Sequence, residues 1–199
     1  MVDFCSNIRP NTVGDRPQIH PSAYIDPAAV IVGNVHIAQN VFVGPTAVIR
    51  ADEPGPDGKV WPVTINAETN IHDGVNIHAS GGSSVEIGSR VTLAHGVIIH
   101  GPCTIEDECF LALRVTVYNA VLKKETWVGL GTMIMHVTIP SYTMIPAGTI
   151  IRSKSDAIYF RTVNKKESRY HQASLNATNN LREGYLALAR GENLKDLKE

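Results

Sequence analysis

Apolar residues recur every six positions along most of this chain. In the first run each repeat begins with a large aliphatic residue and has a small or branched one four places later. The two sets are Ile25, Ile31, Ile37, Val43, Ile49 and Ala29, Val35, Val41, Ala47. An α-helix repeats every 3.6 residues and a half-exposed strand every two. A strict period of six is typical of a parallel β-helix, in which three units make one triangular coil and the large residues stack inside it.

The period is interrupted twice and then continues to about residue 151. Loops rich in glycine, proline or serine break it at 53–62 and at 79–86. A one-residue slip near Ala120 shifts the last units. The unit-start residues after the first run are Ile65, Ile71, Ile77, Ile87, Leu93, Ile99, Ile105, Leu111, Val117, Leu122, Val128 and Ile134. The count of units predicts roughly six to seven coils. Residues 1–20 show no period, and we expect them to form a lead-in that covers the first coil.

The pattern changes to a helical one after Ser155. Asn164 is a candidate N-cap, with Glu167 as its reciprocal partner three residues on. Gly191 is a candidate stop. Apolar residues at helical spacing predict one amphipathic helix packed on a face of the β-helix through Tyr170, Ala173, Ala177, Leu181, Tyr185 and Leu188. The prediction is one structural domain, with the β-helix at 1–155 and the helix and tail at 156–199.

Composition narrows the classes of function. The 199 residues are 43% hydrophobic, which allows a substantial core, and the formal charge of −1 gives no case for nucleic-acid or anionic-membrane binding. No apolar run approaches the length of a membrane-spanning helix, and the N-terminus lacks the pattern of a signal peptide. Of three cysteines, Cys103 and Cys109 fall on inward repeat positions and Cys5 does not. We expect reduced core cysteines and a cytoplasmic protein.

Two histidines occupy equivalent positions one coil apart. Ile77 and Ile99 both begin units and are separated by one full turn, so His78 and His100, which follow them, stack at roughly 4.8 Å. This offset in the repeat points outward. Two stacked outward imidazoles form half of a metal site.

A third histidine needs a second subunit to reach this pair. His95 lies two residues after Leu93, near a corner of the preceding face, and points away from the pair. In a threefold assembly another subunit's corner would meet this face. Two ligands from one chain, one from its neighbour and a water describe an open zinc site. Asp73 stacks under His95 and is expected to orient its ring.

Each of these residues also has an ordinary structural explanation. An outward histidine is usually a solvated surface residue, and His20, His36, His136 and His171 are assigned to that class. His72 borders the cluster but has no stacked histidine partner, so its role stays open. Arg50, Asp52 and Glu53 form either an exposed charge cluster or a functional one. In the second case Arg50 and Asp52 pair across a subunit interface, and Glu53 reaches the metal-bound water.

Several motifs together resemble the gamma-class carbonic anhydrases. They are IRADE, NIHDGVNIH, LAHGVIIHGP, VTIPSYTMIPAG and LREGY, spread over residues 30–188. The resemblance implies an all-β fold, a left-handed β-helix with a C-terminal helix, and a homotrimer with a metal at each interface. By position it implies His78, His95 and His100 as ligands, Arg50 and Asp52 as the interface pair, and Glu53 beside the metal-bound water. Asn70 and Asp73 also match family positions.

Three departures from the family pattern concern the same site. His72 stands where the family usually has a glutamine. The archaeal prototype has an acidic loop with a proton-shuttling glutamate, whereas this chain has ASGGSSVE with Glu86 as its one acidic residue. Asn176 and Thr178 stand where the prototype has a tyrosine and an asparagine.

The resemblance implies a carbonate dehydratase, a lyase that hydrates carbon dioxide to bicarbonate by a metal-bound hydroxide. Zn²⁺ fits the ligands, and Fe²⁺ or Co²⁺ would also accept imidazoles. Glu53, His72 and Asn70 are the candidate catalytic residues. One alternative is a weakly active or inactive metal-binding trimer that serves as a scaffold. The other is a hexapeptide acyltransferase with a histidine base, against which the histidine trio argues.

Overall fold

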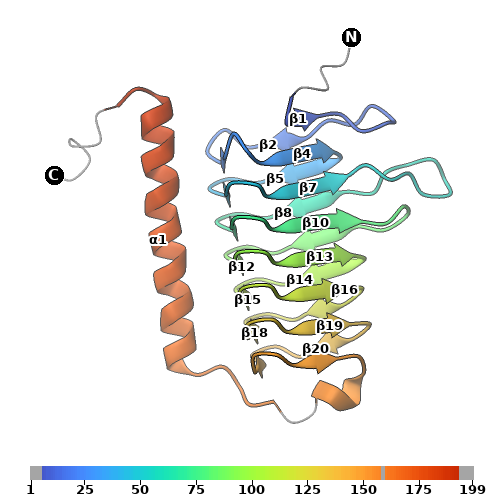
Figure 1. Ribbon diagram of the computed structural model, residues 1–199, viewed down its shortest axis with the longest axis vertical. Helices are drawn as coiled ribbons and strands as arrows, with labels where there is room; N and C mark the ends of the chain where they lie inside the picture. The colour runs from blue at the N-terminus through green and yellow to red at the C-terminus, as the bar shows by residue number, and fades with distance from the viewer. Residues whose placement is uncertain (1–5, 158–159, 193–199) are drawn as a thin grey trace.

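The computed structural model, which describes residues 6–157 and 160–192, is a left-handed parallel β-helix of about seven coils with one long helix beside it (Figure 1). Each coil contributes one short strand to each of three parallel sheets. The fold class expected from the six-residue period is therefore confirmed. Among the described residues, no helix combines the length and the apolar character that crossing a membrane requires.

The three sheets form the sides of the triangular coil. Sheet A contains β1 (Ile8–Arg9), β4 (Val30–Gly33), β7 (Val48–Ala51), β10 (Asn76–Ala79), β13 (Ile98–Gly101), β16 (Thr116–Tyr118), β19 (Met133–Met135) and β22 (Ile150–Ile151). Sheet B contains β2 (Gln18–Ile19), β5 (Val35–Ile37), β8 (Val63–Ile65), β11 (Val85–Ile87), β14 (Cys103–Ile105), β17 (Val121–Leu122) and β20 (Thr138–Ile139). Sheet C contains β3 (Tyr24–Ile25), β6 (Phe42–Val43), β9 (Asn70–Ile71), β12 (Thr92–Leu93), β15 (Phe110–Leu111), β18 (Trp127–Val128) and β21 (Met144–Ile145). A short 3₁₀ helix, η1 (Lys154–Ala157), follows the last strand.

The core is a set of columns of inward aliphatic side chains. Ile31, Ile49, Ile77 and Ile99 are among the unit-start residues that have no exposed surface. Burying one such side chain stabilises the fold by roughly 1.5–3 kcal/mol, so the repeat itself supplies most of the driving force. Cys103 and Cys109 are buried and free, as expected, whereas Cys5 lies outside the described residues.

The first coil begins earlier than the sequence period indicates. β1 pairs with β4 through Ile8 and Ile31, and β2 pairs with β5 through Ile19 and Ile37. The expectation that residues 1–20 are only a lead-in is therefore wrong for the strands they contain. The period is hidden by a turn at residues 11–15, where the Asn11 amide donates to Asp15 Oδ2 at 2.9 Å and to the Ala51 carbonyl at 3.1 Å. The slip near Ala120 is confirmed, because Leu122 pairs with Ile105.

The C-terminal helix, α1 (Lys165–Ala189), begins and ends where its capping residues indicate. The Asn164 side chain accepts from the backbone of Lys166 and Glu167, and Glu167 accepts from the backbone of Asn164. At the other end Gly191 has φ +75°, and the next amide donates back to the Ala187 carbonyl. This left-handed residue closes the helix with the Schellman pattern of hydrogen bonds.

The helix contacts the β-helix with a different face from the one predicted. Tyr170, Leu181 and Leu188 are 61%, 45% and 51% exposed. Ala173 and Ala177 are also exposed, and Tyr185 only partly covers sheet C by stacking on Tyr24. The buried residues of the helix are His171, Leu175, Thr178, Arg182 and Ala187.

Hydrogen bonds explain this orientation of the helix. The His171 and Thr92 side chains are hydrogen-bonded at 3.2 Å, and Arg182 Nη1 donates to the Ser22 carbonyl at 2.7 Å. The assignment of His171 to the solvated surface is therefore wrong. Thr92 on β12 and the Ser22 carbonyl in the turn before β3 present polar groups to α1, and the apolar pattern of the helix gave no signal of these partners.

Candidate metal centre

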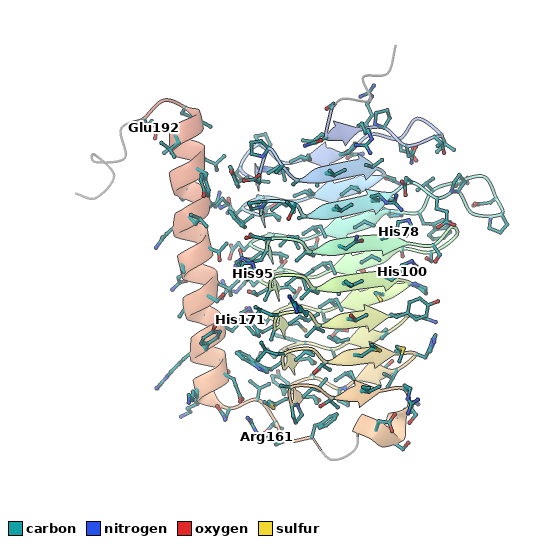
Figure 2. The ribbon with its side chains drawn as sticks, in the orientation of Figure 1. His78, His95, His100, Arg161, His171 and Glu192 are labelled. Carbon is teal, nitrogen blue, oxygen red and sulfur yellow. The ribbon has the colours of Figure 1, made fainter. Side chains whose placement is uncertain are left out.

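His78 and His100 lie side by side on sheet A. They are Cα partners on β10 and β13, which confirms their predicted register. His78 Nδ1 lies 3.4 Å from His100 Nε2, and both side chains are half-buried (Figure 2). Two nitrogens that bind one ion at about 2.0–2.1 Å lie roughly 3.0–3.5 Å apart, so this pair is spaced as two ligands of one ion.

Acidic side chains surround the outer nitrogen of His78. Its Nε2 lies 3.3 Å from Asp52 Oδ1 and 4.0 Å from Glu53 Oε2. This nitrogen is buried and makes no hydrogen bond among the described residues, so the Asp52 contact is close but not hydrogen-bonded. A carboxylate at this place is suited to accept the N–H of a metal-binding imidazole and fix its ring. Burial, and secondarily the neighbouring Arg50, lowers the pKa of His78, which keeps a nitrogen lone pair available.

Arg50 stands next to His78 in the same outward column. They are Cα partners on β7 and β10. Arg50 Nη1 is 3.6 Å from Asp52 Oδ2 of the same chain, which is too long for a hydrogen bond and leaves most of the guanidinium fork free. The pairing of Arg50 with Asp52 across an interface stays a prediction.

Two loops that follow β7 and β10 project from the same edge of the molecule and pack on each other (Figure 1). The contact requires glycine: a Cβ on Gly81 would lie 2.4 Å from the Pro54 carbonyl oxygen and 3.4 Å from Glu53 Cγ. The loop at 79–86 therefore supports the backbone that carries Glu53. Glu86 is on β11 in sheet B, paired with Thr64 and Thr104, and so lies on another side of the coil from His78.

His95 is on the other side of the molecule from the His78–His100 pair, near the edge that faces α1 (Figure 2). Its Nδ1 is 3.6 Å from Asp73 Oδ2, so the two residues are neighbours, as predicted, without a hydrogen bond. The chain does not bring His95 to the other two histidines, as predicted, and the contribution of a second subunit stays a prediction.

His72 contacts His95, which the repeat did not predict. The two ring centroids are 5.1 Å apart, and the ring of Phe42 lies 6.0 Å from that of His72 on its other side. The position stacked on His72 is Ala94, because Leu93 pairs with Ile71. The small side chain of Ala94 leaves room for His72 to approach His95 diagonally. Burial, and secondarily His95, lowers the pKa of His72 to about 4, so this ring is neutral at pH 7.

Asn70 is buried beneath the helix on β9. It is 3% exposed, and its amide nitrogen has no hydrogen-bond partner among the described residues. It lines a cavity of about 260 Å³ between sheet C and α1, together with Asn40, Asn176 and Asn179. Thr178 is buried in the helix interface.

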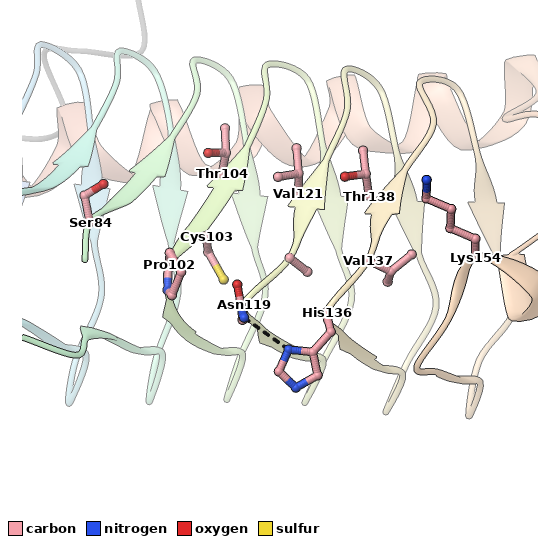
Figure 3. A pocket seen from close by; sticks show the side chains of 11 residues that line it. Ser84, Pro102, Cys103, Thr104, Asn119, Val121, His136, Val137, Thr138 and Lys154 are labelled. Carbon is pink, nitrogen blue, oxygen red and sulfur yellow. Dashed lines mark hydrogen bonds between the residues drawn. The ribbon is translucent and has the colours of Figure 1, made fainter. Parts of the chain in front are cut away.

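A larger cavity lies elsewhere. About 410 Å³ opens over β14, β17 and β20, where the Asn119 amide and His136 Nδ1 are hydrogen-bonded at 3.1 Å (Figure 3). Lys154 and Cys103 also line it. None of the three predicted metal ligands does. The three predicted ligands therefore lie outside this cavity.

Exposed apolar side chains lie near the His78–His100 pair and also near His95. On sheet A, Ile98, Met133 and Ile150 are 44%, 38% and 57% exposed. Leu113 and Leu130 occupy the same corner position as His95 in the next two coils, and this set of equivalent positions is the corner column of His95. The two leucines are 44% and 54% exposed. These are two different surfaces of one chain, so a contact between them would join subunits head to tail, which forms a ring only where the rotation closes.

Comparisons with known proteins find carbonic anhydrases among the relatives of this chain. No family model matches the chain. A carbonic anhydrase of Methanosarcina thermophila is 33% identical over 181 residues, which cover 78% of this chain and 71% of that protein. Gamma carbonic anhydrase 1, mitochondrial, of Arabidopsis thaliana is 27% identical over 194 residues, covering 94% of this chain and 64% of that protein.

Two further comparisons concern proteins of other descriptions. The carboxysome assembly protein CcmM of Nostoc sp. is 33% identical over 191 residues, covering 91% of this chain, and the chain spans about a third of that protein's length. A hexapeptide transferase family protein from Anaplasma phagocytophilum has a similar solved structure, with a TM-score of 0.68, 24% identity and coverage of 88% of this chain and 96% of that one. This structural likeness shows the fold.

Proposed function

This chain belongs to the gamma-class carbonic anhydrase family, and on that premise we propose that it catalyses the reversible hydration of carbon dioxide to bicarbonate. The reaction takes place at a divalent ion held between two subunits of a homotrimer. His78 and His100 of one chain and His95 of the partner subunit hold the ion. The observation that carries the proposal is the His78–His100 pair, in register, with nitrogens 3.4 Å apart and a carboxylate beside the outer nitrogen.

The donor set suits zinc, and ferrous or cobalt ions also accept imidazole nitrogens. When bound with an open position, such an ion lowers the pKa of a bound water to about 7 and so supplies a nucleophile at neutral pH. The fit rests on the 3.4 Å between His78 Nδ1 and His100 Nε2 and on Asp52 Oδ1, which lies 3.3 Å from the other ring nitrogen of His78.

Other side chains of this chain orient the ligands, transfer the proton and pair the subunits. Asp52 Oδ1, 3.3 Å from His78 Nε2, is placed to accept the N–H of that ring and fix its plane once the other nitrogen binds the ion. Glu53 Oε2, exposed and 4.0 Å from His78, accepts the proton that leaves the site and passes it to buffer. Arg50, with its fork largely free, pairs with a carboxylate of the neighbouring chain.

The trimer is supported by the two exposed apolar surfaces. The sheet A surface carries the His78–His100 pair, and the corner column of Leu113 and Leu130 carries His95. One contact therefore buries apolar area and completes the ligand set at once. A triangular coil with one such contact per chain favours threefold closure.

A scaffold role is the second candidate, favoured by the similarity to CcmM, which is described as an assembly protein. In this alternative the trimer binds metal for stability and has little activity. The two candidates differ in turnover and not in metal binding.

The test is stopped-flow carbon dioxide hydration on chelator-free protein loaded in parallel with zinc, cobalt and anaerobic ferrous iron, with metal content measured on the same samples. The enzyme proposal predicts activity that follows metal occupancy. Full occupancy without hydration, even in concentrated small buffers that can replace a proton shuttle, would leave the scaffold role.

A further inference from the structure

The side chains of His72, Asp73 and His95 form a second set of ligand atoms within one chain. Each residue offers one nitrogen or oxygen, and these three atoms all lie within 4.8 Å of one another. The set is at the corner between sheets C and A, away from the His78–His100 pair (Figure 2). We propose that it binds a divalent transition-metal ion without a contribution from a neighbouring subunit.

The distances require little movement for binding. Ligands around one ion at 2.0–2.2 Å lie about 3.0–3.5 Å apart, so an approach of roughly 1 Å by one or two side chains is enough. In the single chain, Asp73 and His95 are exposed and have room to move. His72 is half-buried against Phe42, which fixes the least mobile of the three ligands.

The ligand atoms are not engaged elsewhere. The 3.6 Å between His95 Nδ1 and Asp73 Oδ2 is too long for a hydrogen bond. Within residues 6–157 and 160–192, neither the His72 ring nor the His95 ring is hydrogen-bonded to another side chain.

The donor types define the class of ion. Two imidazoles and one carboxylate suit zinc, iron(II), cobalt(II) or nickel(II), and the two nitrogens disfavour magnesium and calcium. Three ligands leave open positions for water. His72 is the residue that makes this set, because His95 and Asp73 alone supply only two ligands.

This set shares His95 with the proposed interface site, so the two sites compete for that ring. The intrachain set is available when the partner subunit's His78 and His100 are absent. The inference does not rest on carbon dioxide hydration, and its test does not assay that reaction.

The experiment isolates the intrachain set by removing the other pair. The full-length H78A/H100A variant is stripped with chelator, dialysed and titrated with ZnCl₂ by calorimetry and with CoCl₂ by visible absorption. The prediction is about one ion per chain and cobalt d–d bands typical of mixed nitrogen and oxygen ligands. Adding H72Q or D73N to this background weakens zinc binding at least tenfold.

Matched substitutions test whether any histidine or aspartate has the same effect. In the same background H36Q and D57N are expected to bind zinc like the parent, since His36 is on sheet B and Asp57 is in the exposed loop. An H78Q/H100Q background serves if the alanine variant does not fold. No zinc binding in a folded background, or unchanged binding after both H72Q and D73N, would overturn the proposal.

Discussion

His78 and His100 stand opposite each other on adjacent parallel strands, with Nδ1 of the first 3.4 Å from Nε2 of the second. The β-helix brings the two residues side by side by its geometry, since equivalent positions in successive coils lie one strand separation apart. A ligand pair is thereby preorganised on a rigid sheet.

Asp52 is expected to strengthen metal binding through His78. Its Oδ1 is 3.3 Å from the unpartnered Nε2, and loss of such a carboxylate typically weakens metal binding 10–100-fold. D52N should therefore raise the zinc dissociation constant by about that factor in competition with a chelating dye. D57N, in the exposed loop, is the matched control. An unchanged constant in D52N would show that Asp52 does not orient the ring.

Gly81 is expected to control the position of Glu53. In G81A the new methyl group meets the Pro54 carbonyl at 2.4 Å, so the loop must shift and take Glu53 with it. The predicted result is a lower kcat with restoration by concentrated small buffers, because proton transfer and not substrate binding is impaired. G184A is the control, since nothing lies within 4 Å of that added methyl group. Equal kinetics in the two variants would count against a role for the loop.

Arg182 is expected to hold the helix on sheet C. It is 3% exposed and donates to the Ser22 carbonyl at 2.7 Å and to Asn179 Oδ1 at 2.8 Å. R182A leaves these acceptors unpaired beside a cavity and should lower the free energy of unfolding by about 2–4 kcal/mol in urea. R190A, at the exposed end of the helix, should change it by less than about 0.5 kcal/mol. Similar values for both would contradict the structural role of Arg182.

His171 is expected to make stability fall in mild acid. Burial, and secondarily Arg90, lowers its pKa from 6.5 to about 4. Because the folded pKa is below the unfolded one, the contribution is full above pH 6.5 and is lost as the pH falls through 4. Its size is about 3 kcal/mol, from 1.36 kcal/mol per pKa unit.

The measurement for His171 is the free energy of unfolding in urea between pH 7.5 and pH 4, for the wild type and H171L. Other groups titrate in both proteins, so the difference between the two curves isolates this ring. The difference should grow toward acid in favour of H171L. A constant difference across the range would show that His171 is not buried as a neutral ring.

The sequence predicted the coil and the stacked pair because both follow from the repeat. Ile77 and Ile99 mark their positions unambiguously, and the register of His78 on His100 comes with them. The first coil was missed because the turn after Ile8 adds residues between unit starts. A local insertion removes the periodic signal without removing the strand.

The contacts that the sequence did not predict depend on side-chain directions between elements. The helix face was wrong because Tyr170 and Leu181 fit an apolar stripe. His171 instead finds its hydrogen-bond partner on sheet C, and Arg182 finds one in the turn before that sheet's first strand. The His72–His95 contact was missed because it runs diagonally past Ala94. The repeat predicts only contacts between equivalent positions of successive coils. Pairing with the partner subunit involves a second chain and stays a prediction.

The central claim is that two chains supply one catalytic ion, and subunit mixing tests it most directly. H95A keeps the pair on sheet A, and H78A/H100A keeps His95, so neither homomeric variant has a complete interface. After co-refolding at equal amounts, about a quarter of interfaces regain all three histidines, because each neighbour in a ring is drawn independently. The account predicts two inactive variants and about a quarter of wild-type carbon dioxide hydration in the mixture. A mixture as inactive as its components, when the wild type refolded in the same way is active, would contradict it.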